Sequence, residues 1–334
     1  MFDWIPNDVF LLAFGLILLI KGGDWFVDAA SSIAKRFKLP ELLIGATVVS
    51  IGTTLPEVMT SAMAAAGGSG EIAYGNAIGS IICNTSLIAA ITIAIKPGKA
   101  DKKALLFPVC FFFAAAVFYA FNAYAFGRFD RWTGIVLIIG FVAYIIINVI
   151  NMKKNTAIDF RELEEVNEDR QIAEGSFIKD VIVLVSSALV IALGAHLLVN
   201  SATNIAEYLG VPESVIGLTV VALGTSLPEF VTAITALLKG HGALSLGNII
   251  GANIFNLVLV SGAAVIINPF TVPMNATLFG HNASFVLDIP VMFAVMAIMT
   301  IPTVIRGKLA RWQGISLLAI YALFTAVQVY IAFA

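Results

Sequence analysis

Residues 40–56 read PELLIGATVVSIGTTLP, and residues 212–228 read PESVIGLTVVALGTSLP, so the chain carries one segment twice. A glutamate follows each copy, Glu57 in the first and Glu229 in the second, at a constant offset of 172 residues. The match continues at this offset without a gap in both directions, and it pairs Gly22 with Gly194, Asn76 with Asn248, and Asn84 with Asn256. The chain therefore consists of two homologous halves, each with one acid inside strongly apolar sequence.

The composition indicates a membrane protein. Of the 334 residues, 60% are hydrophobic and 12% are charged, whereas soluble domains have about 25% charged residues. So few charges do not cover a globular surface in water, and we expect lipid to cover much of it. The net charge is −2 without a basic cluster, which excludes nucleic acid as an expected partner. Cys83 and Cys110 lie in separate apolar segments and are interpreted as packing residues.

Apolar stretches that are long enough to span a bilayer need about 17–25 residues. The sequence predicts an all-α polytopic protein with ten transmembrane helices, at roughly 8–33, 40–66, 72–95, 104–126, 131–150, 178–206, 212–238, 244–267, 284–302 and 309–332. We predict a first five-helix repeat over 1–150 with its motif at 40–90, and a second over 178–334 with its motif at 212–262. The hydrophilic segment 151–177 is predicted to be a cytoplasmic linker.

Because each half has an odd number of spans, the second half must enter the membrane from the opposite side, which makes the repeats inverted. The loops after the odd-numbered spans carry 16 of the 19 Lys and Arg residues, whereas the termini and the other loops carry 2. By the positive-inside rule, the first set of loops is cytoplasmic and both termini are outside. Inverted repeats of this kind are typical of secondary transporters.

Polar residues in the second span are spaced three or four apart and therefore share one helix face. They are Thr47, Ser50, Thr54, Glu57 and Ser61, and their counterparts in the seventh span are Thr219, Ala222, Ser226, Glu229 and Ala233.

A proline stands directly before each glutamate, at Pro56 and Pro228, and a glycine lies four residues earlier, at Gly52 and Gly224. Because proline lacks a backbone donor and clashes with the preceding turn, we expect a break in each helix. Such a break is tolerated within a membrane where it lines a wet cavity or is buried in protein.

The following span of each half contributes a second polar wall. Amide and small side chains recur four apart, as Asn76, Ser80 and Asn84 in one half and Asn248, Ala252 and Asn256 in the other. The predicted pocket thus combines two carboxylates with hydroxyl, amide and freed carbonyl oxygens, and it has no histidine or cysteine at homologous positions. All-oxygen, anionic coordination favours a hard cation such as Ca²⁺. For Asn76 and Asn248, hydrogen bonding between helices fits equally well.

GTTLPE and GTSLPE, followed by GNAIGSIICN and GNIIGANIFN, resemble the paired alpha repeats of the sodium/calcium exchanger family, in its prokaryotic form. The resemblance implies secondary active antiport of Ca²⁺ against Na⁺ by alternating access. It implies no cofactor, no enzyme activity and no required protein partner, only the two ions and the lipid bilayer. A prokaryotic cell (inner) membrane is the expected location. By family analogy, the first and sixth spans form the moving gate.

The resemblance also implies a ligand set. Glu57 and Glu229 are the shared acidic ligands, and Thr53 and Thr225 offer main-chain carbonyls to Ca²⁺. The flanking sodium sites take carbonyls from Ser50 and Ala222 and hydroxyls from Thr54, Ser226 and Ser80. Asn84 and Asn256 complete the expected site.

Position 252 departs from the family pattern, and position 256 differs between branches of the family. Ala252 stands where the pattern often has serine, so that one sodium site lacks a hydroxyl ligand. Asn256 stands where the potassium-dependent branch has aspartate, which favours exchange without K⁺.

Two other transport functions compete with Na⁺/Ca²⁺ exchange. In a H⁺/Ca²⁺ exchanger of the same superfamily, protons on Glu57 and Glu229 would replace sodium, although the flanking hydroxyls favour Na⁺ because a proton needs no ligand cage. A cation channel usually places its acidic ring around an axis between subunits, and two inverted copies in one chain suit alternating access better. An enzyme is disfavoured because the sequence has no nucleophile–base pair or phosphate-binding loop.

Overall fold

The computed structural model describes residues 5–37, 39–162, 176–208, 222–274 and 277–333. Within these residues, nine helices are long and apolar enough to cross a membrane, and a shorter apolar helix covers 227–238. The prediction of an all-α polytopic protein is therefore confirmed. The first part of the predicted seventh span, 212–221, lies outside the described residues.

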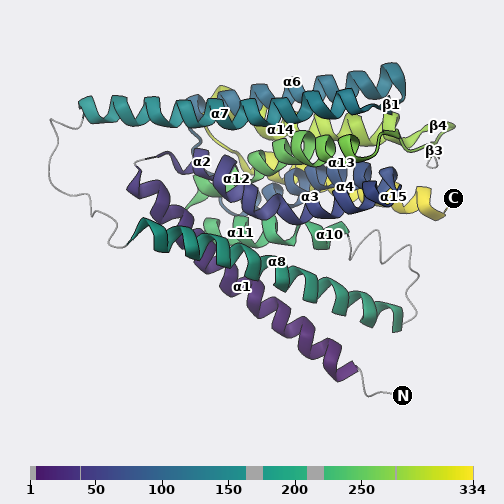
Figure 1. Ribbon diagram of the computed structural model, residues 1–334, viewed down its shortest axis with the longest axis horizontal. Helices are drawn as coiled ribbons and strands as arrows, with labels where there is room; N and C mark the ends of the chain where they lie inside the picture. The colour runs from purple at the N-terminus through teal and green to yellow at the C-terminus, as the bar shows by residue number, and fades with distance from the viewer. Residues whose placement is uncertain (1–4, 38, 163–175, 209–221, 275–276, 334) are drawn as a thin grey trace.

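The two halves present matching elements in the same order (Figure 1). The first half contains α1 (Ile5–Arg36), α2 (Glu41–Ile44), the π-helix η1 (Gly45–Val49), α3 (Ser50–Ala66), α4 (Gly70–Cys83), the π-helix η2 (Asn84–Ala89), α5 (Ala90–Ile95), α6 (Lys102–Phe126), β1 (Arg128–Phe129) and α7 (Arg131–Glu162). The second contains α8 (Phe177–Tyr208), α10 (Ala222–Thr225), α11 (Leu227–Leu238), α12 (Gly242–Phe255), η5 (Asn256–Val260), α13 (Ser261–Ile267), β2 (Phe270–Thr271), β3 (Thr277–Leu278), β4 (His281–Asn282), η6 (Ser284–Asp288), α14 (Ile289–Arg306) and α15 (Arg311–Phe333).

Local details repeat at the same offset. A π-helical segment begins at Asn84 and again at Asn256. Gly68 and Gly240 each have φ of +85°, in the turn that precedes α4 and α12. Both positions require glycine because a side chain is strained in this left-handed region. The symmetry read from the sequence thus extends to the backbone.

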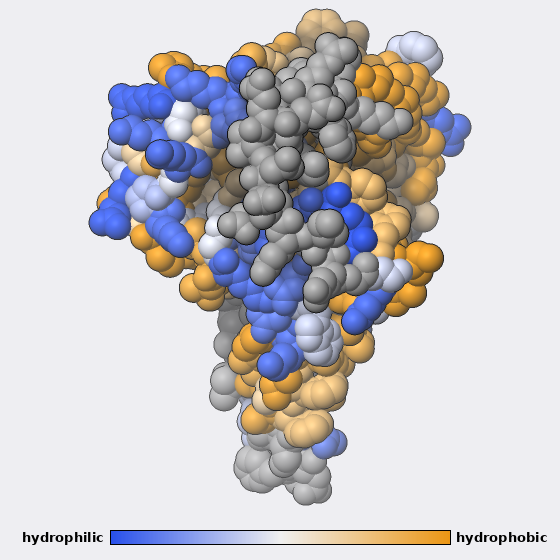
Figure 2. Space-filling view, turned by 90° about the vertical axis from the view of Figure 1, so that its left-hand side faces the viewer, coloured by the Kyte–Doolittle hydropathy of each residue, from blue (hydrophilic) through white to orange (hydrophobic). Residues whose placement is uncertain are grey.

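The Lys- and Arg-rich loops gather at one end of the bundle. Arg36, at the end of α1, lies 3.5 Å from Asp180 at the start of α8. Nearby along the same end, the ammonium of Lys102 donates to the carbonyl of Ile305. Figure 2 views the molecule from this end and shows hydrophilic residues spread over it. This convergence of loops is what inverted repeats of five spans require.

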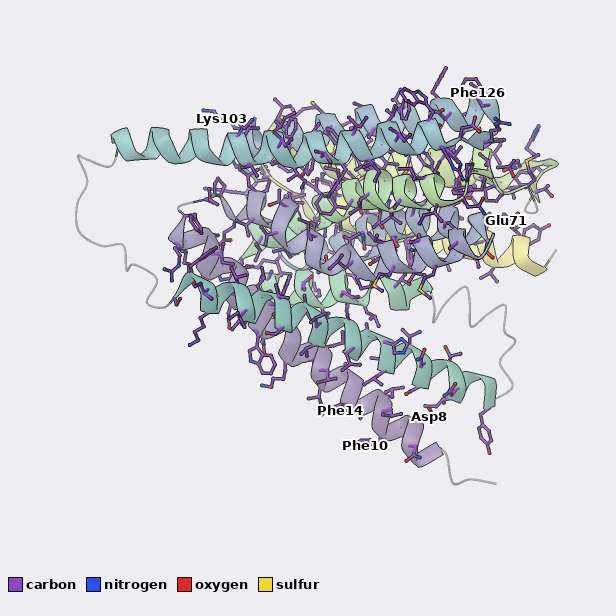
Figure 3. All side chains as sticks on the ribbon, in the orientation of Figure 1. Asp8, Phe10, Phe14, Glu71, Lys103 and Phe126 are labelled. Atoms are coloured by element: carbon purple, nitrogen blue, oxygen red, sulfur yellow. The ribbon has the colours of Figure 1, made fainter. Side chains whose placement is uncertain are left out.

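The remaining loops meet at the opposite end. Strands β1 and β2 pair antiparallel there, with Arg128 opposite Thr271. Asn204, near the end of α8, donates to Asp8 near the start of α1 at 3.0 Å. Figure 3 labels Lys103 at one end and Asp8 at the other.

Helices α1 and α8 form a pair that leans away from the rest of the bundle (Figure 1). They approach closely because Gly15 and Gly194 face one another, and a Cβ on either glycine would lie 2.8 Å from the carbonyl oxygen of the other. Gly23 of α1 packs on α11, where an added Cβ would lie 2.6 Å from Val231. Larger residues of α1 also contribute to this contact, since Phe26 shares a buried cluster with Val49 of η1 and Ala236 of α11.

The centre of the molecule is formed by the helices that carry the repeated motifs. In the most apolar part of the span 242–267, 83% is buried, and in that of the span 70–95, 72% is buried, compared with 28% for the spans of α1 and α8. The acids and amides of the motifs are consequently held at the most enclosed part of the bundle.

The helix break expected beside Pro56 is wrong, because α3 runs continuously from Ser50 to Ala66 with Pro56 inside it. One missing backbone donor is tolerated where the surrounding helices hold the segment. The irregularity lies about two turns before Pro56, in η1 (Gly45–Val49). In the second half a break is present, since Ser226 leaves helical geometry (φ −91°, ψ 7°) between α10 and α11, and Pro228 lies in the first turn of α11.

Candidate cation site

The two repeated glutamates meet in the buried centre. Glu57 of α3 and Glu229 of α11 are both fully buried. Thr54, one turn before Glu57, donates its hydroxyl to Glu229 Oε1 at 3.4 Å. Both carboxylate oxygens of Glu57, and Oε2 of Glu229, have no hydrogen-bond partner among the described residues. Buried carboxylates are normally paired or bind metal ions, so this geometry fits a cation between them.

Two amides from the next helices are also buried without partners. Asn84 and Asn256 begin η2 and η5, and neither side chain is exposed. Neither the oxygen nor the nitrogen of either amide has a hydrogen-bond partner in the described part of the chain, and the same holds for Ser226 Oγ. Native proteins rarely leave buried polar atoms unpaired. Their concentration at equivalent positions of both repeats indicates a site for a bound ion.

The π-helical segments explain why these positions are available. A π-helix adds one residue to a turn, and such segments occur frequently at functional sites. Asn84 and Asn256 each stand where an α-helix changes into a π-helix. In the same way, η1 ends directly before Ser50, whose hydroxyl and backbone N–H both donate to the carbonyl of Gly45, the hydroxyl at 2.7 Å.

Unlike Asn84 and Asn256, Asn248 has hydrogen-bond partners, and its amide connects three helices. Its Oδ1 accepts from Ser50 Oγ and Thr53 Oγ1, both at 3.3 Å, and its Nδ2 donates to Thr232 Oγ1 at 2.9 Å. The counterpart Asn76 donates to the backbone carbonyl of Glu57 at 3.3 Å and to Ser61. Of the two interpretations open from the sequence, hydrogen bonding between helices is the one confirmed.

Glycine lets α12 approach α3. A Cβ added to Gly251 would collide with Ser50 Oγ, and one added to Gly247 would collide with the carbonyl oxygen of Leu42. Small residues at this spacing permit close backbone contact between membrane helices. The contact brings Asn248 within reach of Ser50 and Thr53.

The other predicted site residues are placed as follows. Thr53 is 2% exposed and Ser80 is 4% exposed, one turn before Asn84, while Thr225 is partly exposed in α10. Ala252, which is equivalent to Ser80 in the second repeat, is fully buried. Thr219 and the side chain of Ala222 lie outside the part of the chain that the structure describes.

Two residues next to the site escaped sequence reasoning. Thr232 accepts from Asn248 and donates to the carbonyl of Pro228 at 2.9 Å, so it fixes the first turn of α11. Cys83 is buried directly before Asn84, and its sulfur lies 3.9 Å from the hydroxyl of Tyr321. Its position directly before Asn84 in the motif was the available signal.

The donor set fits a hard cation. Oxygen atoms of carboxylates, amides and hydroxyls surround the centre, and these are the ligands that Ca²⁺ takes in proteins. Among the described residues, no group of three or more His, Cys, Asp and Glu side chains is positioned to hold a metal ion. Among the described residues, Glu57 and Glu229 therefore supply the acidic side chains of the site.

Comparison with known proteins gives a consistent result. The family profile described as "Sodium/calcium exchanger protein" matches residues 8–150 and 179–330. A sodium/calcium exchanger of Methanosarcina acetivorans is 32% identical, over 98% of this chain and all of that protein. An inner membrane protein of Escherichia coli is 32% identical over 89% of this chain and 90% of its own.

Among solved structures, the sodium–calcium exchanger NCX_Mj, soaked with 2.5 mM Na⁺ and 10 mM Sr²⁺, superposes with a TM-score of 0.78. The two chains are 31% identical, and the match covers 96% of this chain and 99% of NCX_Mj. The helix arrangement described above is therefore that of a solved exchanger.

Proposed function

Because this chain belongs to the sodium/calcium exchanger family, we propose that it carries Ca²⁺ across the membrane in exchange for Na⁺ by alternating access. It is an integral multi-pass membrane protein of a transporter family and not an enzyme. The observation that carries the proposal is the pair of buried glutamates, one from each repeat, whose oxygens lack protein partners among the described residues.

Glu57 and Glu229 bind Ca²⁺ between them in this proposal, and the main-chain carbonyls of Thr53 and Thr225 complete its coordination. The support is geometric. Thr54 lies one turn before Glu57 in the first repeat, and its hydroxyl donates to Glu229 of the second repeat. Two opposed carboxylates match the double charge of one Ca²⁺ ion.

Sodium occupies the flanks of the same pocket. We assign it the hydroxyls of Thr54, Ser226 and Ser80 and the carbonyls of Ser50 and Ala222. Asn84 and Asn256 supply amide oxygens to the pocket, in agreement with their lack of any other partner in the described residues. Several weak oxygen ligands suit Na⁺ better than a proton, and this favours Na⁺ over H⁺ as the coupling ion.

The charges of the pocket explain why exchange is obligatory. An ionised carboxylate at the bilayer centre costs about 2.5–3.5 kcal/mol on insertion scales, and the empty pocket holds two. One Ca²⁺ ion neutralises both, and Na⁺ ions bound together do the same. The loaded protein therefore changes sides readily, whereas the empty protein does not, and this difference couples the two ion fluxes.

The orientation follows from the distribution of charge. The end of the bundle with most of the Lys and Arg residues faces the cytoplasm in this proposal, and both termini face the outside. The location is a prokaryotic cell membrane. No protein partner is required, because both halves of the site come from one chain.

We assign the moving gate to α1 and α8. Only 28% of the most apolar window of each of their spans is buried, against 83% for the span 242–267, and Gly23 of α1 allows close approach to α11. Sliding of this pair would open one side of the pocket at a time without disturbing the helices that hold the acids.

The test is uptake of radiolabelled Ca²⁺ into proteoliposomes under an outward Na⁺ gradient, an outward H⁺ gradient, or neither. We expect uptake with the Na⁺ gradient and background uptake in the other two conditions. Uptake driven by the H⁺ gradient alone would assign the protein to proton exchange. Uptake that needs no gradient of a second ion and follows the Ca²⁺ gradient would indicate a channel.

A second comparison addresses K⁺. Since Asn256 is an amide where an additional carboxylate would be needed, Na⁺-driven uptake should continue when choline replaces all K⁺. Loss of uptake under this replacement would show that the interpretation of Asn256 is wrong.

A further inference from the structure

A cavity of about 250 Å³ lies at the Lys- and Arg-rich end of the molecule, between the loop after α5 and the start of α12. We call it the loop cavity. None of the proposed cation ligands lines it. Its walls come from both repeats and include Thr92, Lys96, Gly98, Lys99, Leu237 and Ser245.

The internal repeat supplies a reference for this cavity at the opposite end of the molecule. At the offset of 172 residues, the loop 96–99 (KPGK) corresponds to 268–271 (NPFT). The residue after each loop is held by a similar backbone hydrogen bond. The N–H of Ala100 donates to the carbonyl of Gly307 at 3.0 Å, and that of Val272 donates to the carbonyl of Gly127 at 2.9 Å. Differences between the two ends therefore arise from side chains.

At the opposite end, an aromatic ring fills the equivalent space. Phe270 packs against a small cluster of alanines, Ala65, Ala73 and Ala264. A Cβ added to Gly70, the first residue of α4, would collide with it.

In the loop cavity, the position of Phe270 is occupied by Gly98. A Cβ added to Gly98, or to Gly242 at the start of α12, meets nothing within 4 Å. The cavity therefore exists because glycine replaces the ring.

The wall residues change in the same direction, from apolar or neutral to polar or basic. Ser245 replaces Ala73 and Thr92 replaces Ala264, while Lys96 and Lys99 replace Asn268 and Thr271. Ser245 is 3% exposed, and its Oγ has no hydrogen-bond partner among the described residues. Lys96 and Lys99 are exposed, and neither forms an ion pair with a described residue.

The start of α12 adds a further positive contribution. This helix of 14 residues begins at Gly242, which lines the cavity together with Ala243. The preceding residue, His241, gives no side-chain cap to the first turn. Uncapped amides at a helix N-terminus attract anions. The carboxylate of the adjacent Glu41 is engaged with His241 Nδ1 at 2.7 Å.

We propose that the loop cavity binds a phosphate group. Two lysines, the uncapped amides of α12 and the hydroxyl of Ser245 form a donor set for a compact anion with several oxygens. The phosphate comes either from the headgroup of an anionic lipid or from free phosphate in solution. Ile95, which is 62% exposed directly before Lys96, places an apolar side chain beside the cavity and makes lipid access feasible.

The experiment measures binding and does not depend on transport. The apparent melting temperature of the full-length protein in detergent is measured with inorganic phosphate, with phosphatidylglycerol and with phosphatidylcholine. Gly98→Phe places a ring in the cavity, as Phe270 does in the other repeat. The double variant Lys96→Asn, Lys99→Thr introduces the side chains that the loop 268–271 has at these positions. Lys103→Gln is the matched control, because it removes one charge from the same end without lining the cavity.

We expect a saturable rise in melting temperature for the unmodified protein and for Lys103→Gln. Loss of the two lysines should weaken binding roughly tenfold, as expected for two solvent-exposed ionic contacts, and Gly98→Phe should abolish it. A rise with inorganic phosphate identifies free phosphate as sufficient, and a rise with phosphatidylglycerol alone identifies the lipid. The proposal is overturned if neither raises the melting temperature, or if the lysine double variant responds like Lys103→Gln. The double variant keeps the test valid if Gly98→Phe does not fold.

Discussion

At the scale of single residues, the proposed exchange depends on the unpaired oxygens of Glu57 and Glu229. Both side chains are fully buried, and three of their four oxygens have no partner in the described residues. In a protein that only needed these helices to pack, such oxygens would be costly. Their cost is explained if the residues are needed to bind and release a cation.

Glu57→Gln and Glu229→Gln should each reduce Na⁺-driven Ca²⁺ uptake to the level of protein-free vesicles, since each removes half of the charge that Ca²⁺ neutralises. Melting temperature in detergent should not fall, because the removed charge has little protein support. Glu71→Gln, which removes an exposed acid of α4, is the control and should transport normally. Near-normal uptake by either buried variant would remove the basis of the two-carboxylate site.

Ala252→Ser should tighten Na⁺ binding, because Ser80 at the equivalent position supplies a hydroxyl that the alanine lacks. The expected gain is that of one hydrogen bond, about 0.5–1.5 kcal/mol, with a smaller effect on Ca²⁺. The measurement is the Na⁺ concentration for half-maximal Ca²⁺ release at fixed Ca²⁺ and voltage. An unchanged or higher value would mean that residue 252 does not border a sodium site.

The sequence predicts the acidic residues of the site well, because a repeated acid in apolar sequence is rare and costly. It does not separate the asparagines by role. Asn248 bonds three helices, whereas Asn256, two turns later, has no partner in the described residues. That difference depends on which helices surround each amide, and spacing along one helix carries no such information.

At the scale of elements, the contact between α12 and α3 positions the site. Gly247 and Gly251 allow the approach, and Asn248 fixes it by hydrogen bonds. The sequence predicts these helices and their glycines correctly, but it places the irregularity of the second span at Pro56 instead of in η1. The error arises because proline affects one bond, while tertiary packing decides where a helix departs from regular geometry.

Asn248→Ala and Asn256→Ala should therefore differ, although both truncate a buried asparagine of α12 or its extension. The first removes the hydrogen bonds between the Asn248 amide and Ser50, Thr53 and Thr232, at a cost of about 1–3 kcal/mol, and should lower the melting temperature by roughly 5 °C. The second removes an amide without protein partners and should leave the melting temperature unchanged while weakening ion binding. Equal destabilisation of the two variants would contradict the assignment of their roles.

At the scale of the whole molecule, α1 and α8 pair with one another, and α1 contacts the bundle in its second half, where Gly23 meets Val231 and Phe26 shares a buried cluster with Ala236. At the Lys- and Arg-rich end, Lys239 after α11 binds Asp28 of α1 at 2.8 Å and also lies 3.4 Å from Asp24. At the other end, Asp8 of α1 is hydrogen-bonded to Asn204 of α8. The arrangement fits a gate that moves as a pair and is held at one end.

Two cysteine pairs test this motion in a Cys110→Ser background. A reducible cross-link between Asp8→Cys and Asn204→Cys joins α1 to α8 and should leave Ca²⁺ uptake nearly unchanged, because the two helices move together. A cross-link between Asp28→Cys and Lys239→Cys joins α1 to the bundle and should stop uptake until it is reduced. Inhibition of the same size by both cross-links would contradict the assignment of α1 and α8 as one moving unit.

The central claim is that Ca²⁺ and Na⁺ compete for one site built from Glu57 and Glu229. It is tested most directly by equilibrium binding of radiolabelled Ca²⁺ to the purified protein, with increasing Na⁺. We predict one Ca²⁺ ion per chain, displaced by Na⁺ along a sigmoidal curve, and no specific binding when both glutamates are glutamine. Ca²⁺ binding that survives in the double variant, or that Na⁺ does not displace, would contradict the account.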